Sequence, residues 1–552
     1  MADNFYGSFC LVLHSHLPLV IKHDKMDEEW LLEATAETYI PLINVIRKLA
    51  AHNVAPHITI GISPILAEQL NHPYFKKVFK EYCKSKIEFA EKDERDFKST
   101  SPHLSYLARL WQDFYKKTLG IFETKFKEDL IAIFRDLQDA GHIEIITCAA
   151  THAYLPLLSQ DTSIQAQIKM AVKSYRRLFG RNPRGIWLPE CGYRSSYSWH
   201  NPLPDHAQEI PYLRKGIDEY LSENGLEFFV VDQHQLDRAM PPNMQKSSFE
   251  TYYSGGYTQS PVTIFTRDFR LSQKVWEHQA GYPGDGAYLE FHKKHHGGWL
   301  RYWRITHNEM DLAYKQPYVP EETFGKRIPD HAGHFKSLIK QSLEANYHIV
   351  GKPKLALCAF DSELFGHWWF EGPSWLYYLL EWIGKDPELD LSTCSGYLNS
   401  NPAGSEIILP DSSWGKDFND STWMNPEVYW VWERVYSAER EIQYLAEAFA
   451  ENQDAKLHRI LRMAIRELFY LQASDWEFMI TNWSTRDHAE ARVVQHHSDF
   501  QRLAKMAWSW GLERKVETTE WDWLAAQEKL RGEIFPDPEL AWFSRLEYLP
   551  HG

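Results

Sequence analysis

Two acidic residues stand directly after apolar segments that lie far apart in the chain. Residues 185–189 precede Glu190, residues 355–360 precede Asp361, and aromatic side chains follow both. An apolar run that stops at one carboxylate is typical of a buried parallel strand that delivers an acid to one end of a barrel. Two such carboxylates indicate chemistry on a glycosidic bond, which requires a pair of them.

The surroundings of each carboxylate favour a different role. Cleavage with retention needs a nucleophile and a proton donor about 5 to 5.5 Å apart. Glu190 follows Trp187 and Pro189, a setting that holds a carboxylate rigidly beside a sugar, so we assign it as the nucleophile. Asp361 leaves an all-apolar strand, where desolvation would raise its pKa, so we assign it as the acid/base. For either residue alone, a loop cap or a salt bridge is an equally good interpretation.

A pair of histidines ends the first apolar run. His14 and His16 lie on one face of a strand, because side chains alternate with a period of two. Together with His152 and Asp361 they could hold zinc for a hydrolase or a deacetylase. Neutral imidazoles could instead bond to sugar hydroxyls, and a purely structural pair is the third possibility.

Aromatic residues are abundant, with 22 Trp, 29 Tyr and 29 Phe. Many tryptophans fall in expected loops, where their rings suit the apolar faces of sugars: Trp276, Trp299, Trp303, Trp368, Trp369, Trp414 and Trp423. Ordinary core packing is the competing interpretation, and we expect it for Trp508 and Trp510.

Seven short apolar runs predict strands, at residues 9–13, 57–62, 143–149, 185–188, 227–231, 262–266 and 355–360. Helical patterns separate several of them, at residues 27–49, 164–179 and 211–223. Alternating strands and helices predict a parallel sheet, and polar residues follow every run. In a closed α/β barrel the active site belongs at that end.

The remaining segments predict the domain organisation. We expect a catalytic barrel over residues 1–414, with an inserted helical subdomain at 64–142, and a C-terminal helical domain at 415–552 that contributes to the active site. Residues 268–354 are rich in Gly, His and aromatics and are interpreted as long active-site loops. Residues 233–261 are expected to form a mobile loop.

Bulk composition narrows the class of protein. The 552 residues carry a net charge of −15 without a dense basic cluster, which argues against nucleic acid as a partner. The first twenty residues fit neither a signal peptide nor a membrane span, so the expected location is the cytoplasm, without membrane association. Six scattered cysteines without a CxxC pair are expected to be reduced thiols. We expect a monomer or a small homo-oligomer.

Four sequence blocks resemble glycoside hydrolase family 57, in the expected order and over nearly the whole chain. Residues 14–18 resemble its first region, residues 187–193 the third region with the nucleophile, and residues 360–369 the fourth with the proton donor. Residues 473–478 resemble the fifth. Within the family, residues 366–372 and the chain length are most similar to the 1,4-α-glucan branching enzymes.

This resemblance implies a fold and an activity. The fold would be a (β/α)7 barrel followed by a helical domain whose Asp475 reaches back to the active site. The activity would be transfer of an α-1,4-glucan segment, from amylose, amylopectin or glycogen, onto a 6-hydroxyl. The resemblance also implies no metal and no other cofactor, which counts against zinc at His14 and His16.

The resemblance also implies glucan contacts. Beside His14 and His16, the probable ones are Arg267, Gly284, Trp414 and Asp475, and the weaker ones are Trp30, His152, Trp276 and Trp423. After Asp475 the chain departs from the branching enzymes, because residues 482–485 replace a Gly-Gln pair; Ser484 is the possible substitute. A loop tyrosine would cover the donor, and Tyr252, Tyr253 and Tyr257 are equally eligible.

Several alternatives stay open from the sequence. Within the family, an α-amylase or a 4-α-glucanotransferase would use the same carboxylates. A zinc-dependent carbohydrate deacetylase would use His14, His16 and His152 as ligands. A glucan-binding protein without catalysis would keep the aromatic loops and use the carboxylates for structure only.

Overall fold

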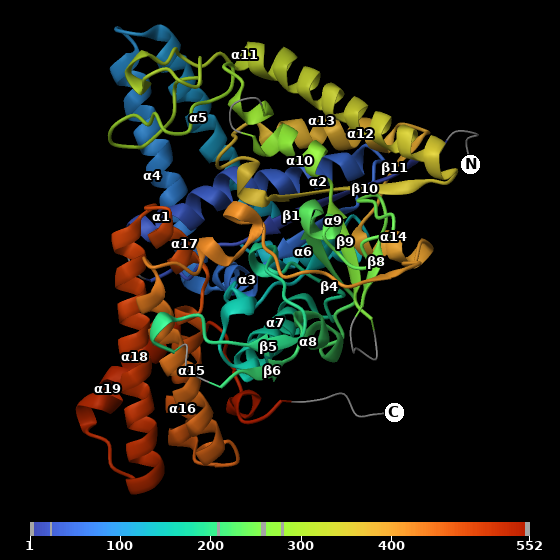
Figure 1. The fold of residues 1–552 in the computed structure, drawn as a ribbon. Helices are drawn as coiled ribbons and strands as arrows, with labels where there is room; N and C mark the ends of the chain where they lie inside the picture. Colours follow the sequence, from blue (N-terminus) through green and yellow to red (C-terminus); the bar gives the residue numbers. More distant parts are fainter. Residues whose placement is uncertain (1–4, 23–24, 207–209, 256–260, 278–280, 547–552) are drawn as a thin grey trace.

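Seven parallel strands form a closed ring in the computed structural model, which describes residues 5–22, 25–206, 210–255, 261–277 and 281–546 (Figure 1). The strands are β1 (Gly7–Ser15), β2 (Ile58–Ile62), β3 (Ile143–Ile146), β4 (Gly185–Ile186), β7 (Phe228–Asp232), β9 (Thr263–Arg267) and β10 (Lys354–Asp361). Parallel ladders join β10, β1, β2 and β3, and others join β4, β7 and β9.

Two backbone contacts close this ring. The N–H of Trp187 donates to the Thr147 carbonyl at 2.8 Å, which joins β3 to β4. The N–H of Asp268 donates to the Leu357 carbonyl at 2.8 Å, which joins β9 to β10. The seven predicted runs are therefore the seven barrel strands, in the same order.

Alternate residues of these strands fill the barrel interior. The interior cluster contains Cys10 and Val12 of β1, Phe228 and Val230 of β7, Phe265 of β9, and Leu355, Leu357 and Ala359 of β10. Because side chains alternate with a period of two, the next interior positions along these strands are His14, Asp232, Arg267 and Asp361. These four polar side chains therefore lie at the carboxyl end of the barrel, directly after its apolar interior.

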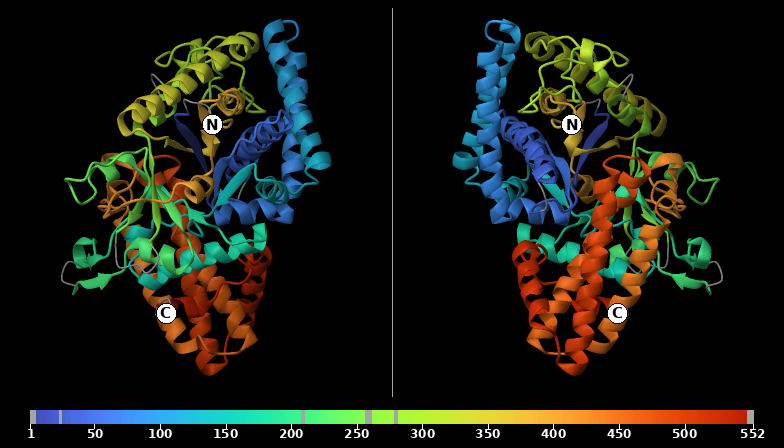
Figure 2. Two further views of the ribbon diagram at one scale, coloured as in Figure 1. Left: turned by 90° about the vertical axis from the view of Figure 1, so that its right-hand side faces the viewer. Right: turned by 90° about the vertical axis from the view of Figure 1, so that its left-hand side faces the viewer.

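Helices cover the outside of the barrel. They include α1 (Lys25–Ala34), α2 (Ile40–Ala51), α7 (Asp161–Phe179), α8 (Ile217–Glu223), α13 (Gly372–Gly384) and α14 (Cys394–Ser400), and a short strand β11 (Leu389–Leu391) pairs with β1. Residues 64–142 hold α3 (Pro64–Asn71), α4 (Pro73–Phe97), α5 (Pro102–Gly120) and α6 (Leu130–Asp139) before β3 begins. In both views of Figure 2, α4 and α5 stand side by side along one flank of the molecule.

Residues 268–354 are not mainly loops, which corrects one expectation. They contain α10 (Phe269–Trp276) and the long helix α12 (Ile328–Val350), which packs against α13. Phe335, Ile339 and Leu343 of α12 are completely buried. Their spacing of four residues is a helical pattern that the surrounding Gly, His and aromatic content concealed.

The described part of the segment 233–261 is also more ordered than expected. It contains α9 (Gln233–Asp237) and β8 (Tyr252–Ser254), which pairs with β9 and with β12 (Glu406–Ile407). Tyr252 is completely buried, so it holds the sheet together and does not belong to a mobile loop. Tyr257 lies outside the described residues.

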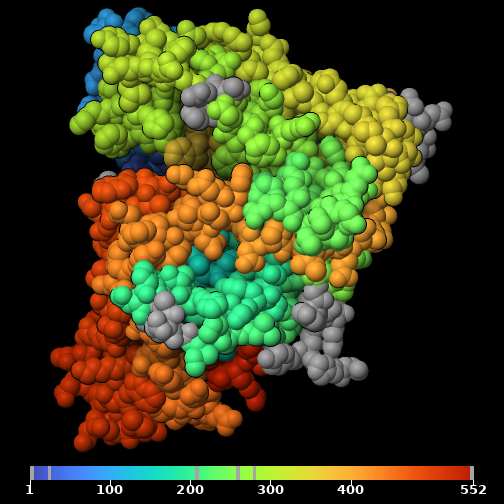
Figure 3. All heavy atoms as spheres, in the orientation of Figure 1, coloured from blue at the N-terminus to red at the C-terminus, as the bar shows by residue number. Residues whose placement is uncertain are grey.

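The last part of the chain is helical. Its helices are α15 (Tyr429–Phe449), α16 (Ala455–Leu471), α17 (Asp475–Thr481), α18 (Arg486–Glu513) and α19 (Thr518–Arg531). Their buried residues belong to the same hydrophobic cluster as the outer barrel residues. In Figure 3, orange atoms of the region after residue 400 cross the molecule between the yellow-green upper part and the teal part below.

Two further observations concern the whole described chain. Within the described ranges, none of the helices has the length and apolarity to cross a bilayer. All six cysteines are buried and free, although the sulfur atoms of Cys10 and Cys394 lie 3.5 Å apart.

Candidate active site

Glu190 lies in a strained turn after β4. Glu190 and Cys191 have φ angles of 58° and 50°, in the left-handed region that costs a non-glycine residue about 1–3 kcal/mol. Trp414 holds this turn through two hydrogen bonds. Its backbone N–H donates to the Glu190 carbonyl at 2.9 Å, and its indole Nε1 donates to Glu190 Oε2 at 2.7 Å. The carboxylate is thus fixed by a residue more than two hundred positions away.

Asp361 is the last residue of β10 and the register partner of His14 on β1. Both residues extend the interior rows of the barrel, so their side chains face the same end. Burial raises the pKa of Asp361 to about 6, while the nearby His16 and Arg267 lower it. The acid predicted from the sequence therefore has the desolvated setting that the apolar strand suggested.

The two carboxyl groups belong to one site. Burial raises the pKa of Glu190 to about 8, and the negative charges of Asp361 and Asp475 raise it further against the hydrogen bond from Trp414, which lowers it. The sequence pointed to Asp361 as the group with the raised pKa. In the structure the pKa values of both carboxyl groups are raised, and that of Glu190 is raised more. The reason is that Glu190 must ionise beside two other carboxylates, so the pair retains one proton near neutral pH.

Three histidines form a stack behind the carboxylates. His14 Nε2 lies 3.0 Å from His152 Nε2, and the rings of His16 and His152 stack with centroids 4.0 Å apart. His152 Nδ1 lies 3.8 Å from Glu190 Oε1. Burial and the neighbouring imidazoles lower the pKa of His152 well below its usual value, and the same two causes act on His14. Both rings are therefore neutral at physiological pH.

The C-terminal helices reach this stack. Asp475, the first residue of α17, has Oδ2 at 3.0 Å from His16 Nε2. The opposite nitrogen of His16 lies 2.8 Å from Ser63 Oγ, and Ser474 Oγ lies 2.9 Å from His152 Nδ1. Both imidazoles thus have partners that fix their orientation. For each imidazole, one of these partners, Asp475 or Ser474, comes from the C-terminal helical region.

A buried ion pair lies on the β7–β9 side. Arg267 donates to Asp232, whose other oxygen lies 3.2 Å from His234 Nδ1. The guanidinium also lies over the Trp414 ring, 5.3 Å from its centroid. Asp232 is 1% exposed and was not singled out as a site residue from the sequence. Its place in an interior row at the strand end was the signal that could have identified it.

The predicted aromatic contacts separate into two groups. Trp276 is 36% exposed and lies edge-on to Trp414, with ring centroids 6.0 Å apart, so it borders the site. Trp423 is completely buried and stacks on Tyr154 at 4.5 Å. The Trp423 ring packs against the backbone of Gly415, next to Trp414, and its contact with a glucan stays a prediction.

Three other predicted contacts lie apart from this group. Trp30 is half-buried on α1, Gly284 is half-buried in a short turn, and Ser484 is exposed after α17. Among the described residues, none of the hydrogen bonds or ring contacts joins them to the residues around Glu190. They stay predictions for a bound glucan chain.

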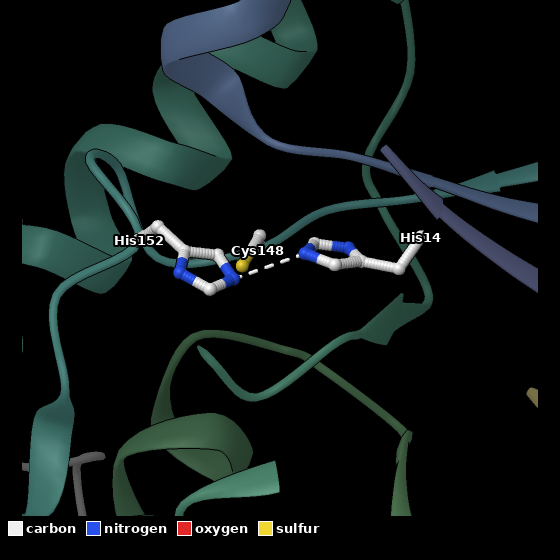
Figure 4. A group of neighbouring side chains, drawn as sticks. All are labelled: His14, Cys148 and His152. Carbon is white, nitrogen blue, oxygen red and sulfur yellow. Dashed lines mark hydrogen bonds between the residues drawn. The ribbon is translucent and has the colours of Figure 1, made fainter. Parts of the chain in front are cut away.

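Of the three groups of described side chains that could hold a metal ion, two overlap at this site. One is His14, Cys148 and His152, shown in Figure 4, and the other is His16, His152 and Asp475. In each group the ligand atoms lie within 4.8 Å of one another. The set expected from the sequence, with both His14 and His16 on one ion, is divided between these two groups, and Cys148 is a member that the sequence did not suggest.

Comparison with known proteins places the whole chain in a family. Residues 10–410 match the model of glycosyl hydrolase family 57, and residues 434–543 match the C-terminal domain of 1,4-alpha-glucan branching enzymes. The chain belongs to glycosyl hydrolase family 57. The resemblance seen in the four sequence blocks is therefore confirmed, together with the barrel and the helical C-terminal region.

Similar proteins within the family are branching enzymes and an amylase. The family 57 chain is 38% identical over 514 residues to a 1,4-alpha-glucan branching enzyme of Thermococcus kodakarensis, covering 90% of this chain and 73% of the relative. The crystal structure of a family 57 branching enzyme from Pyrococcus horikoshii superimposes with a TM-score of 0.91 at 35% identity, over 98% of each chain. An alpha-amylase of Thermotoga maritima gives a TM-score of 0.82 at 28% identity, over 98% of this chain and 99% of the amylase.

Proposed function

We propose that this chain is a retaining 1,4-α-glucan branching enzyme, which cleaves an α-1,4 bond and transfers the released segment to a 6-hydroxyl. The observation that carries this proposal is the pairing of Glu190 and Asp361 at one end of the barrel, in a chain that matches both the catalytic and the C-terminal models of these enzymes. Its reaction is a double displacement.

The two half-reactions divide the work between the carboxyl groups. In the first, Glu190 attacks the anomeric carbon while Asp361 gives its proton to the departing O4. In the second, Asp361 takes the proton of an incoming 6-hydroxyl, which displaces Glu190 from the anomeric carbon. Proton and charge balance because the reactive pair begins and ends with one proton, on Asp361. Since the pKa of Glu190, about 8, lies above that of Asp361, about 6, this proton must first move from Glu190 to Asp361 when the glucan binds.

One hydrogen bond opposes the preference of that proton for Glu190. The Trp414 indole donates to Glu190 and lowers its pKa, so it stabilises the carboxylate form that a nucleophile needs. Developing positive charge at the anomeric carbon would stabilise it further in the transition state. Neutral His14 and His152 can bind sugar hydroxyls, and Asp475 keeps His16 in place.

An α-amylase is the second candidate, because a family 57 amylase has nearly the same structure. The same carboxylates would then activate water in place of a 6-hydroxyl. The higher identity to branching enzymes and the match of the C-terminal model favour transfer. The deacetylase, the 4-α-glucanotransferase and the pure binding protein are not favoured.

The proposal extends to organisation and setting. We propose a catalytic unit at residues 1–414, including the helical subdomain 64–142, and a helical domain at 415–552 that supplies Asp475. The partner is α-glucan, and the assembly is a monomer or small homo-oligomer. The cytoplasm is the proposed location.

Proton NMR of amylose after incubation tests the reaction. Transfer predicts a growing α-1,6 anomeric signal with a nearly constant number of reducing ends. Growth of reducing ends without that signal would mean hydrolysis and would overturn branching, and longer linear chains would mean a glucanotransferase.

A further inference from the structure

His14, Cys148 and His152 converge behind the carboxylates from three parts of the barrel. His14 is the last but one residue of β1, Cys148 follows β3 by two residues, and His152 lies in the loop beyond it. Figure 4 shows the two imidazoles facing each other edge to edge, with the sulfur beside the His152 ring. The three ligand atoms lie within 4.8 Å of one another, and all three residues are buried.

The two imidazoles can offer Nε2 lone pairs at once. Burial keeps both rings neutral. A neutral His152 can carry its one ring proton on Nδ1 and donate it to Ser474 Oγ, which lies 2.9 Å away. The Nε2 lone pair is then free. His14 Nδ1 is buried without a hydrogen-bond partner among the described residues, so a proton that moves there breaks no existing bond. Only the mutual 3.0 Å contact of the Nε2 atoms is given up.

We propose that His14, Cys148 and His152 bind a thiophilic divalent ion such as Zn²⁺, and that the bound ion inhibits the enzyme. The ligands are two imidazole nitrogens and one thiolate, a donor set that zinc prefers, and a fourth position stays open. Binding releases the thiol proton of Cys148 to solvent, and the proton shared by the Nε2 atoms moves to His14 Nδ1. Zn–N bonds of about 2.0–2.1 Å would separate the two nitrogens by roughly 3.3 Å, so the rings need to part by only a few tenths of an ångström.

The second group, His16, His152 and Asp475, competes for the same ion. Both groups need His152, so one ion occupies one of them. The thiolate favours the first group for a borderline or soft ion, because Asp475 is a hard oxygen ligand. A metal at the first group also leaves the His16–Asp475 contact intact.

Inhibition follows from the position of His152. Its Nδ1 lies 3.8 Å from Glu190 Oε1, and its ring stacks on His16. A dication bound at its other nitrogen would attract the Glu190 carboxylate and repel the positive charge that develops at the anomeric carbon, so it would oppose the attack. This second half of the inference rests on the proposed function, whereas the binding half does not.

Cobalt substitution tests the binding half without reference to activity. Under anaerobic conditions, Co²⁺ added to the full chain should give one bound ion and a near-ultraviolet thiolate-to-cobalt charge-transfer band. Cys148→Ala should lose the band and weaken binding by more than the about 10- to 100-fold typical of changes around a metal site. Cys358→Ala, at another completely buried cysteine of the barrel, is the matched control and should keep the band.

The other outcomes overturn the assignment. No band in the wild type, or a band that survives in Cys148→Ala, excludes Cys148 as a ligand. A bound ion without a thiolate band would place the ion at a group without Cys148, either His16, His152 and Asp475 or Glu33, Glu37 and His367. For inhibition, Zn²⁺ should suppress wild-type turnover and a chelator should restore it, while Cys148→Ala stays active in Zn²⁺; equal inhibition of both proteins would contradict this half. If the chain lacks branching activity, the cobalt band still decides the site.

Discussion

Trp414 Nε1 lies 2.7 Å from Glu190 Oε2, and the backbones of the same two residues are joined by a second hydrogen bond of 2.9 Å. The carboxylate that we propose as the nucleophile is therefore held by a residue that follows the last barrel strand by some fifty positions. Four consequences of this site geometry can be measured, and three of them have a control variant in the same chain.

Trp414→Phe removes the indole donor and keeps an aromatic ring. The hydrogen bond lowers the pKa of Glu190, so its loss raises that pKa further and depletes the carboxylate at neutral pH. A bond to a charged group contributes about 1.5–3 kcal/mol, so kcat/KM should fall roughly 10- to 100-fold, and the acid limb of its pH profile should move to higher pH. Trp276→Phe, at the adjacent ring, should change KM without moving the acid limb; a shift in both variants would contradict the assignment.

Asp475→Asn should move the acid limb of the kcat/KM pH profile in the opposite direction from Trp414→Phe. The negative charge of Asp475 raises the pKa of Glu190, so its neutralisation lowers that pKa and shifts the acid limb to lower pH. Activity should still fall about 10- to 100-fold, because His16 loses its charged partner and its fixed orientation. The melting temperature reports on the fold. An unshifted acid limb at full stability would mean that α17 does not act on the carboxylate pair.

Glu190→Gln should remove a pH-dependent loss of stability. The folded-state pKa of about 8 lies above the ordinary 4.5, so the native chain holds this proton more tightly than the unfolded chain. That stabilisation is complete below the unfolded pKa and is lost as pH rises through about 8. Glutamine does not titrate. The melting temperature of the variant minus that of the wild type should therefore increase as the pH rises from about 5 to about 9. Glu433→Gln, at an exposed position of α15, should show no such trend, and a constant difference for Glu190→Gln would contradict the burial argument.

Arg267→Met should destabilise the barrel through Asp232. The substitution leaves a carboxylate that is 1% exposed without its cation, which costs about 3–5 kcal/mol when a buried pair loses one partner. Urea unfolding measures the loss. The control is Arg184→Met, because the Arg184–Glu227 pair is 38% and 49% exposed and should contribute only about 0–1 kcal/mol. Equal costs for the two variants would show that burial of Asp232 is irrelevant.

The sequence predicted the parts of the structure that follow from local periodicity. Apolar runs located all seven barrel strands, and the polar residues that follow these runs placed His14 and Asp361 at the same end. It missed α12, because Phe335, Ile339 and Leu343 stand among residues typical of loops. It also took Trp423 for a surface ring, since composition cannot tell a tryptophan in a loop from one buried beneath it.

Contacts between distant segments could not be predicted from spacing. His16 and Asp475 are 459 positions apart, and only the family resemblance brought Asp475 to the site. Asp232 and Cys148 were within reach of sequence reasoning as interior strand residues, but their partners became visible only in three dimensions. The raised pKa of Glu190 likewise depends on which charges the fold brings beside it.

The roles of the two carboxyl groups can be tested most directly by azide rescue with an α-maltooligosyl fluoride, whose leaving group needs no acid. In Glu190→Ala, azide should take the place of the nucleophile and give the β-glycosyl azide. In Asp361→Ala, azide should attack the covalent intermediate and give the α-glycosyl azide. The reverse pattern, or rescue of neither variant while both remain folded, would contradict the assignment of Glu190 as nucleophile and Asp361 as acid/base.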